Sequence, residues 1–193
     1  MRIVVICCSA LLVAVASLAS NPRPSLTADA FQVDSVHSSM VFRVKHMGTA
    51  NFYGRFNSIS GSFSLDDDPA KSSFQVQIKT DSVDTANTKR DQHLKSPDFF
   101  NAAQFPTISF KSTQVKKVGG EGIDVTGDLT LHGVTKPVIA KVTKTGSGGS
   151  RGRAIAGVEA QLTIKRSDFG MTFAADSLGD EVFIIISLEG AKQ

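Results

Sequence analysis

The sequence predicts an all-β protein, an eight-stranded antiparallel β-barrel with one short helical insert. Apolar residues recur at every second position along most of the chain after Phe31, which is the period of a strand with one buried face. About eight such segments follow one another without the alternating helices that accompany a parallel sheet. Several of the segments are long and contain glycines, and closing a sheet into a barrel requires long, tilted and coiled strands.

The first 19 residues differ from the rest of the chain and predict a signal peptide. Met1-Arg2 precedes an apolar run from Ile3 to Leu18, and Ser17-Leu18-Ala19 has the small-x-small pattern of a signal-peptidase site. We expect cleavage after Ala19, with Ala28 as a weaker alternative. A retained membrane anchor is the other interpretation, although the run is short for a membrane span and polar sequence follows it at once.

The rest of the chain is expected to form one domain behind a tether. Residues 20–30 include Pro22 and Pro24 and predict the tether, and the barrel domain is expected at residues 31–190. The two cysteines, Cys7 and Cys8, lie in the signal peptide. The exported domain would therefore have no disulfide, no thiolate nucleophile and no cysteine metal ligand.

The strands are expected where alternation places apolar residues on one face. These inward positions are Met40, Phe42 and Val44; Phe52, Gly54 and Phe56; Ile59, Gly61, Phe63 and Leu65; Phe74, Val76 and Ile78; Ile108 and Phe110; Ile123, Val125, Gly127, Leu129 and Leu131; Val138, Ala140 and Val142; Ala156, Val158, Ala160, Leu162 and Ile164; Val182, Ile184, Ile186 and Leu188. The alternation slips by one residue between Phe56 and Ile59, which predicts a β-bulge or a bend in one long strand.

Other segments lack alternation and predict turns, a helix and loops. Residues 66–69 predict a turn, and residues 87–96 predict a short helix that ends before Pro97. Phe99, Phe100 and Phe105 are expected in a loop after this helix. Gly146-Ser147-Gly148-Gly149-Ser150 has the composition of a flexible loop.

Small residues in the inward register suggest that the barrel has room for a guest. They are Gly54, Gly61, Gly127, Ala140, Ala156 and Ala160. The interior of an eight-stranded barrel is wide enough either to be filled by side chains or to hold one small ligand. Beside the 13 phenylalanines of the chain, such positions predict an aromatic-walled channel that only an apolar guest can fill. The alternative is that the glycines mark barrel corners and that nothing is bound.

Charge and motifs exclude several classes of function. The formal net charge is +3 and no stripe of Lys and Arg forms, which argues against a nucleic-acid partner. His37, His46, His93 and His132 lack metal-ligand spacing, and no phosphate-binding loop, dinucleotide fingerprint or nucleophile elbow occurs. We therefore expect no catalytic residue and no metal site.

Two charged groups leave alternatives open. Arg90 and Asp91 could anchor the short helix against the barrel, which we favour. Alternatively, Arg90 or Arg166 could meet an anionic lipid head group at the mouth of the barrel.

Ordered motifs from about Phe31 to Leu188 resemble those of the YceI-like family. They are Val33-Asp34, His37-Ser38, Phe42-x-Val44-x-His46 and Gly54-x-Phe56; Thr88-x-Arg90-Asp91-x-His93-Leu94-x-Ser96-x-Asp98-Phe99-Phe100; Phe105-Pro106-x-Ile108-x-Phe110; Gly127-Asp128-Leu129-Thr130-Leu131-His132-Gly133-Val134-Thr135-Lys136-Pro137; Arg166-Ser167-Asp168-Phe169-Gly170-Met171; and Gly179-Asp180-Glu181-Val182. The chain has Phe31 where the family often has Trp, a conservative departure.

The resemblance implies a lipocalin-like, eight-stranded barrel whose lumen binds polyisoprenoids, isoprenoid quinones or other long-chain amphiphiles. It also implies a periplasmic or secreted location, which agrees with the signal peptide, and a homodimer in some members. Apolar positions in the matching motifs are the implied lipid-binding residues: Phe42, Phe56, Ile108, Phe110, Leu129, Leu131, Phe169 and Met171. Phe99, Phe100 and Phe105 are candidates for a lid, and Phe63, Val76 and Ile78 are added on alternation alone.

The expected function is that of an exported carrier or store of such a lipid, with a possible link to stress. No cofactor is expected beyond the bound lipid or quinone, and no stable membrane insertion after processing. One alternative is an enzyme acting on a lipid with His37 or His132 as acid/base, which requires two titratable groups converging on the lumen. The other is a structural module that binds a protein through an exposed apolar patch.

Overall fold

The computed structural model describes residues 29–120, 122–150 and 152–193. The predicted signal peptide lies outside these residues, as does the predicted tether up to residue 28. Within the described part, no helix has the length and hydropathy needed to cross a membrane.

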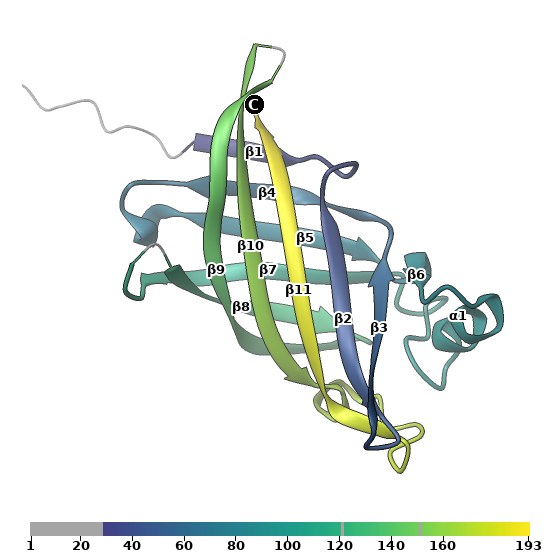
Figure 1. The fold of residues 1–193 in the computed structure, drawn as a ribbon. Coiled ribbons are helices and arrows are strands. Elements are labelled where there is room, and N and C mark those ends of the chain that lie inside the picture. Colours follow the sequence, from purple (N-terminus) through teal and green to yellow (C-terminus); the bar gives the residue numbers. More distant parts are fainter. Residues whose placement is uncertain (1–28, 121, 151) are drawn as a thin grey trace, which may run out of the picture.

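The strands form one antiparallel sheet that closes on itself (Figure 1). Its order is β1-β4-β5-β7-β8-β9-β10-β11-β2-β3-β6, and β1 also pairs with β11. The strands are β1 (Asp29–Val33), β2 (Ser39–His46), β3 (Ala50–Phe56), β4 (Ile59–Leu65), β5 (Ser73–Lys79), β6 (Val83–Asp84), β7 (Thr107–Lys117), β8 (Gly122–Leu131), β9 (Val134–Ser150), β10 (Arg153–Lys165) and β11 (Leu178–Lys192). The predicted eight-stranded barrel is confirmed: β1, β4, β5 and β7 to β11 form the closed ring, and β2, β3 and β6 extend it.

One long strand, β11, joins the ring to its extension. One edge of β11 pairs with β10 over most of its length. On the other edge, residues 178–187 pair with β2 and residues 190–192 pair with β1. We call the end of the barrel near β1 and the C-terminus the upper end, and the end near the β2–β3 turn the lower end (Figure 1).

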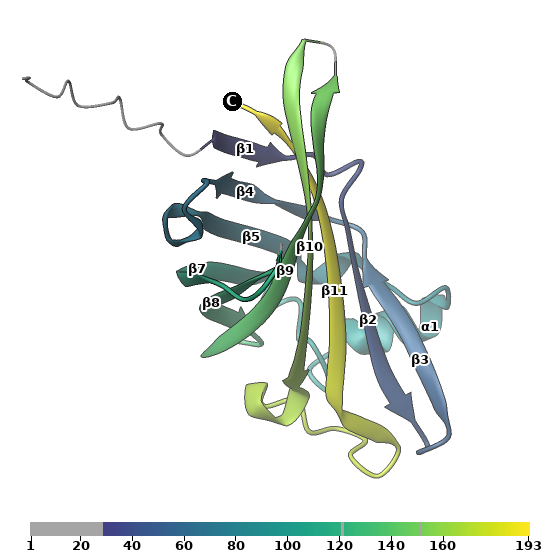
Figure 2. The ribbon, with the colours of Figure 1, turned by 60° about the vertical axis from the view of Figure 1, so that its left-hand side comes forward.

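In the part of the chain that the structure describes, a single α-helix, α1 (Thr88–Lys95), lies beside the lower half of the barrel near β3 and β6 (Figures 1 and 2). Its start is capped by the Asn87 side chain, which accepts a hydrogen bond from the backbone of Arg90. It ends at Ser96, immediately before Pro97. The predicted helix is thus confirmed, because the cap and the proline define its two ends.

Short 3₁₀ helices join some of the strands: η1 (Pro69–Lys71), η2 (Thr80–Ser82) and η3 (Arg166–Phe169). The Asp68 side chain caps η1 by accepting from the backbone of Ala70, so the predicted turn at residues 66–69 is present.

The slip in alternation after Phe56 is not a bulge within one long strand. It marks a corner between β3, which pairs with β2 and β6, and β4, which pairs with β1 and β5. The corner is held by backbone hydrogen bonds from Asn57 to Ser82 and from Lys79 to Ser58. A bulge and a corner shift the alternation alike, so the sequence pattern does not distinguish them.

The predicted flexible loop at residues 146–150 is also wrong. These residues belong to β9 and pair with residues 153–157 of β10, and the hairpin extends beyond the upper end of the barrel (Figure 1). The antiparallel partner satisfies the backbone of this segment, which overrides its glycine- and serine-rich composition.

Candidate ligand-binding site

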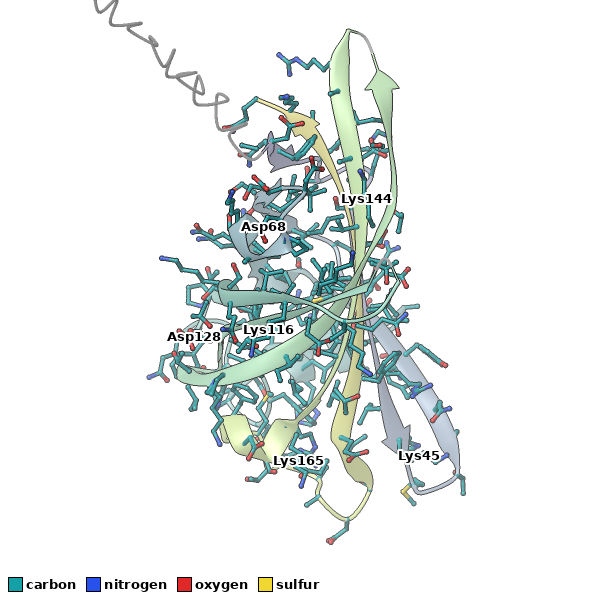
Figure 3. The ribbon with its side chains drawn as sticks, turned by 90° about the vertical axis from the view of Figure 1, so that its left-hand side faces the viewer. Lys45, Asp68, Lys116, Asp128, Lys144 and Lys165 are labelled. Carbon is teal, nitrogen blue, oxygen red and sulfur yellow. The ribbon has the colours of Figure 1, made fainter. Side chains whose placement is uncertain are left out.

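The lower half of the barrel encloses a cavity of about 150 Å³, the lower cavity. Its lining side chains come from β2, β5, β7 to β11 and from the segment around α1. Every lining residue except Ser109 and Arg166 is apolar. Charged side chains occur at both ends of the barrel, with Lys45 and Lys165 near the lower end and Lys144 towards the upper end (Figure 3).

Most of the predicted lipid-binding residues line this cavity. They are Phe42, Val76, Ile78, Phe99, Phe100, Ile108, Phe110, Leu129, Leu131 and Met171. They come from β2, β5, β7, β8, the loop after α1 and the loop after η3, so distant parts of the chain meet in one lumen.

Phe56, Phe63, Phe105 and Phe169 do not line the cavity but support the residues that do. Phe56 packs against Phe42 and Phe100, with ring centroids 5.8 and 5.3 Å apart. Phe63 stacks between Phe31 and Phe74. 

Phe105 and Phe169 both contact His132. The Phe105 ring lies 4.8 Å from the imidazole, and the Phe169 carbonyl oxygen is 3.0 Å from its Nδ1. Phe105 is therefore part of the wall near the β8–β9 turn and not part of a lid.

Residues of β9, β10 and β11 contribute to the lining but were absent from the set chosen by motif. Val142, Ala160, Leu162, Ile184 and Leu188 are examples. All five lie in the inward register that alternation identified, so the period-two pattern was the signal that could have found them.

The inward glycines do not leave empty space, contrary to expectation. A Cβ atom on Gly54 would lie 2.3 Å from Cζ of Phe42, and one on Gly127 would lie 2.4 Å from Cζ of Phe110. Each glycine therefore accommodates the ring of a residue on the neighbouring strand. Gly61 has a φ of +138°, and a Cβ there would lie 2.1 Å from the carbonyl oxygen of Gln75.

Only two of the six small inward residues, Ala140 and Ala160, line the lower cavity. Filling Gly127 with a large side chain would thus collide with the wall rather than block the channel.

Aromatic side chains close the lower cavity beside α1. Phe99 and Phe100, in the loop after the helix, line the cavity directly. The rings of His93, Phe99 and Phe173 contact each other edge to face, with centroids 5.1 to 5.3 Å apart. We call these three residues the aromatic cluster; it connects α1 and its loop to the loop between η3 and β11.

Arg90 anchors the helix, as the favoured interpretation predicted. Its Nε donates to Thr85 Oγ1 at 2.8 Å and its Nη2 donates to the Thr85 carbonyl oxygen at 2.7 Å. The guanidinium also lies 4.5 Å above the ring of Phe52. Asp91 accepts a hydrogen bond from the backbone of Thr85 at 2.9 Å.

Arg166 is buried, and its hydrogen bonds go to backbone carbonyl groups. It donates to the carbonyl oxygens of Met171, Phe173, Leu178 and Gly179 at 2.7 to 3.1 Å. The guanidinium thereby fixes the loop between η3 and β11, which carries Met171 and Phe173. 

Next to Arg166, hydrogen bonds from the backbone and the hydroxyl of Ser167 lower the pKa of Asp180. The carboxylate thus remains charged and holds the start of η3.

The histidines considered as acid/base residues do not line the lower cavity. His37 is exposed on the turn between β1 and β2, where its Nδ1 lies 2.9 Å from Asp34 Oδ2. The hydrogen bond with Asp34 raises the pKa of His37 and lowers that of Asp34. His132 packs under Phe105 and uses Nδ1 on the Phe169 carbonyl group.

Asp34, His37 and Glu189 form a group that sequence reasoning missed. Their ligand atoms lie within 4.8 Å of one another. Glu189 is far away in the chain, and the turn between β1 and β2 comes beside it through the backbone hydrogen bond from Asp34 to Glu189. In the structure these side chains form an exposed ion-paired cluster.

A second cavity, the upper cavity, occupies the upper end of the barrel and has a volume of about 570 Å³. Its apolar walls include Phe31, Ile123 and Ala156, and charged side chains of Asp29, Asp66, Asp67 and Lys144 border it. Val142 and Val158 line both cavities.

Comparison with known proteins agrees with this architecture. The family model described as "YceI-like domain" matches residues 31–190. The protein named "Protein YceI" from Escherichia coli O6:H1 is 42% identical over 182 residues, which cover 92% of this chain and 94% of that protein. 

Two solved structures share the barrel. The crystal structure of Burkholderia cenocepacia BcnA has a TM-score of 0.75 and 26% identity, over 81% of this chain and 98% of that one. A structure from Saccharophagus degradans described as a polyisoprenoid binding domain has a TM-score of 0.66 and 18% identity, over 86% of this chain and 99% of that one.

Proposed function

We propose, given that the chain belongs to the YceI-like family, that its barrel binds the hydrocarbon tail of a long-chain lipid without transforming it. Polyisoprenoids, isoprenoid quinones and comparable amphiphiles are the proposed class. The observation that carries the proposal is the lower cavity, which is closed in by strands and apolar over almost its whole lining.

The lining selects its guest by the cost of desolvation. A polar group moved into such a cavity loses its hydrogen bonds to water and finds few partners, whereas each buried CH₂ contributes about 0.8 kcal/mol. Water itself gains little there, because apolar cavities of this kind stay dry. A hydrocarbon tail meets both requirements, because it gains from burial and has no polar group to desolvate. A solved structure described as a polyisoprenoid binding domain has the same fold, so this type of barrel is compatible with such a guest.

The role is binding rather than catalysis. An enzyme acting on the tail would need titratable groups converging on the lumen. His37 lies outside the barrel, His132 is held against Phe105 and Phe169, and Arg166 is engaged with backbone carbonyl groups. 

Protein binding through an exposed apolar patch has less support. The large apolar side chains that are exposed in the described residues come from six separate segments: Val36, Met47, Tyr53, Val118, Ile139 and Phe173.

The predicted signal peptide supports export to the periplasm or the exterior, where a lipid carrier or store would work. Mass spectrometry of the mature protein from its native host tests this part of the proposal. A chain that begins at residue 20 is expected, and a chain that retains residues 1–19 would contradict it.

Native mass spectrometry of the mature protein, followed by organic extraction, tests the binding itself. We expect a bound long-chain lipid that leaves on extraction. Ala160→Phe fills the lower cavity and should abolish the lipid, whereas Gln161→Phe adds the same ring on the exposed face of β10 and should not. Protein without extractable lipid, or equal occupancy in both variants, would contradict the proposal.

A further inference from the structure

The lower and upper cavities are consecutive sections of one lumen. On β8, Val125 lines the lower cavity and Ile123 the upper one; on β10, Ala160 lines the lower and Ala156 the upper. Residues two or four apart on a strand lie on the same face, about 7 and 13 Å apart. Each strand therefore passes directly from one cavity to the other.

Val142 of β9 and Val158 of β10 stand where the two sections meet. They line both cavities and are 4% and 2% exposed. Val142 pairs with Ala160 across the sheet, so Val158 is its diagonal neighbour on the inward face. Both side chains are β-branched and therefore stiff at χ1. We call this pair the constriction.

Three stacked phenylalanine rings on β1, β4 and β5 also lie between the two cavities. The Phe63 ring lies between those of Phe31 and Phe74, at centroid distances of 5.3 and 6.2 Å. Phe31 lines the upper cavity and Phe74 the lower one. The change from one cavity to the other thus also falls among these rings, on strands that lie across the barrel from β9 and β10.

The volumes of the two cavities indicate that a long tail must extend beyond the lower cavity. The lower cavity, at about 150 Å³, is close in size to apolar cavities that accept a guest such as benzene. A long tail does not fit in that space alone, whereas the upper cavity offers about 570 Å³, with apolar side chains such as Phe31, Ile123 and Ala156 on its inner walls and charged side chains at its border.

Entry is expected at the lower end. The loop with Phe99 and Phe100 closes that end with hydrogen bonds to its own backbone and to α1 but without strand pairing, so it can open without breaking the sheet. At the upper end, a hydrocarbon would have to desolvate the carboxylates of Asp29, Asp66 and Asp67.

We propose that Val142 and Val158 set the length of tail that the barrel accepts, and that the upper cavity is a second part of the lipid site, reached only by tails that extend past this pair of side chains. This inference rests on the proposed function. Short tails end below the constriction, and longer ones are bound in proportion to how easily they pass it.

The test offers the full mature protein an equimolar series of linear isoprenoid alcohols with increasing numbers of isoprene units. Native mass spectrometry then gives the distribution of bound lengths. The double variant Val142→Ala/Val158→Ala should shift it to longer alcohols, with a gain of about tenfold or more in the ratio of long to short. Val142→Leu should shift it to shorter ones, and this opposite result stands even if the double variant does not fold.

The matched control is Val83→Ala/Val115→Ala, which removes the same atoms from two buried valines that line neither cavity. It should leave the distribution at its original lengths. If the constriction variants and this control give the same distribution, the length-setting role is overturned while lipid binding stands. If the unaltered protein binds no alcohol of any length, the proposed function fails, and this inference fails with it.

Discussion

Glycine and phenylalanine act as pairs in the wall of this barrel. Gly54 receives the ring of Phe42, and Gly127 receives that of Phe110. Without these glycines the rings would have to turn further into the lumen. The absence of a Cβ thus flattens the aromatic wall and keeps the cavity free.

Gly54→Ala should therefore destabilise the protein by about 1–3 kcal/mol, the usual cost of overpacking. The three atoms nearest to the new Cβ all belong to the Phe42 ring, so Phe42→Leu in the same chain should restore part of the loss. Chemical denaturation of the two single variants and the double variant measures the coupling. Gly146→Ala is the control, since a Cβ there meets nothing within 4 Å.

Arg166→Met should destabilise the fold by about 2–4 kcal/mol, because it leaves buried carbonyl groups without donors. The carbonyl groups affected include those of Met171, Phe173 and Leu178. Thermal unfolding measures the loss. Arg43→Met is the comparison, since Arg43 lies 4.8 Å above the exposed side of Phe183 and should cost much less. Equal losses would contradict the structural role of Arg166.

The His37–Asp34 pair should make the free energy of unfolding depend on pH, with its full contribution in one range of pH. The raised pKa of His37 gives stability that is complete below pH 6.5 and lost as the pH rises through the folded value. The lowered pKa of Asp34 gives stability that is complete above pH 3.8 and lost as the pH falls through its own folded value. Both contributions are present between pH 3.8 and 6.5.

Titration of the His37 imidazole by NMR checks this. Its midpoint should lie above the ordinary value and return towards it in Asp34→Asn, because the hydrogen bond with Asp34 is the largest cause of the shift. Glu189→Gln should move it less, since that carboxylate is 3.8 Å away. A larger effect of Glu189→Gln would contradict the assignment.

At the level of elements, α1 and the loops on either side of the aromatic cluster control access to the lower cavity. Arg90 attaches the helix to Thr85, and Arg166 fixes the loop that carries Phe173. Between the two loops, the side chains of the cluster meet through ring contacts, and the hydrogen bond of His93 with Asp98 adds a polar contact within the α1 side.

Phe173→Ala should speed the exchange of bound lipid severalfold, because it removes the ring that connects the two loops. Transfer of the lipid from the protein to phosphatidylcholine vesicles, followed by mass spectrometry, gives the rate. Tyr53→Ala removes another exposed aromatic ring, on β3, and should leave the rate unchanged. An unchanged rate in Phe173→Ala would show that this cluster does not limit exchange.

Sequence patterns predicted these elements to different degrees. The helix was predictable because Asn87 and Pro97 define its ends by local chemistry. The corner at Asn57 and Ser58 was misassigned because parity alone carries no information about which strands pair. Residues 146–150 were misassigned because their structure depends on a partner, residues 153–157, and not on their own composition.

For the whole molecule, closure depends on a short seam between the two ends of the barrel domain. β1 and β11 pair at Phe31 with Lys192, Gln32 with Ala191 and Val33 with Gly190. Gly190 also lies against the ring of Phe63 and the Cβ atom of Phe31. The seam therefore joins backbone pairing to the packing beside the constriction.

Removal of residues 190–193 should open the barrel, lower the melting temperature by several degrees and release the lipid, since hydrophobic burial and strand pairing are lost together. Removal of Gln193 alone takes away its backbone hydrogen bond to Ala30 and should have a small effect. Thermal unfolding and lipid occupancy of the two truncations provide the check. Similar behaviour would contradict the importance of the seam.

The site could be predicted only in part, because it depends on depth in the barrel. Alternation shows which residues point inward, and it identified Phe42, Phe56 and Phe63 alike. Only the assembled barrel shows that Phe42 faces open space while Phe56 and Phe63 pack behind other rings. The constriction likewise arises from two strands whose register is set by pairing.

Because β1 and β11 pair, the start and the end of the folded domain emerge together at the upper end of the barrel, whereas α1 lies beside its lower half (Figure 1). An affinity tag, a fluorescent label or a surface linker placed on either terminus would thus sit away from the loop of Phe99 and Phe100. Protein immobilised in this way should present its loading side to the solution, which makes sensor chips suitable for measuring lipid capture.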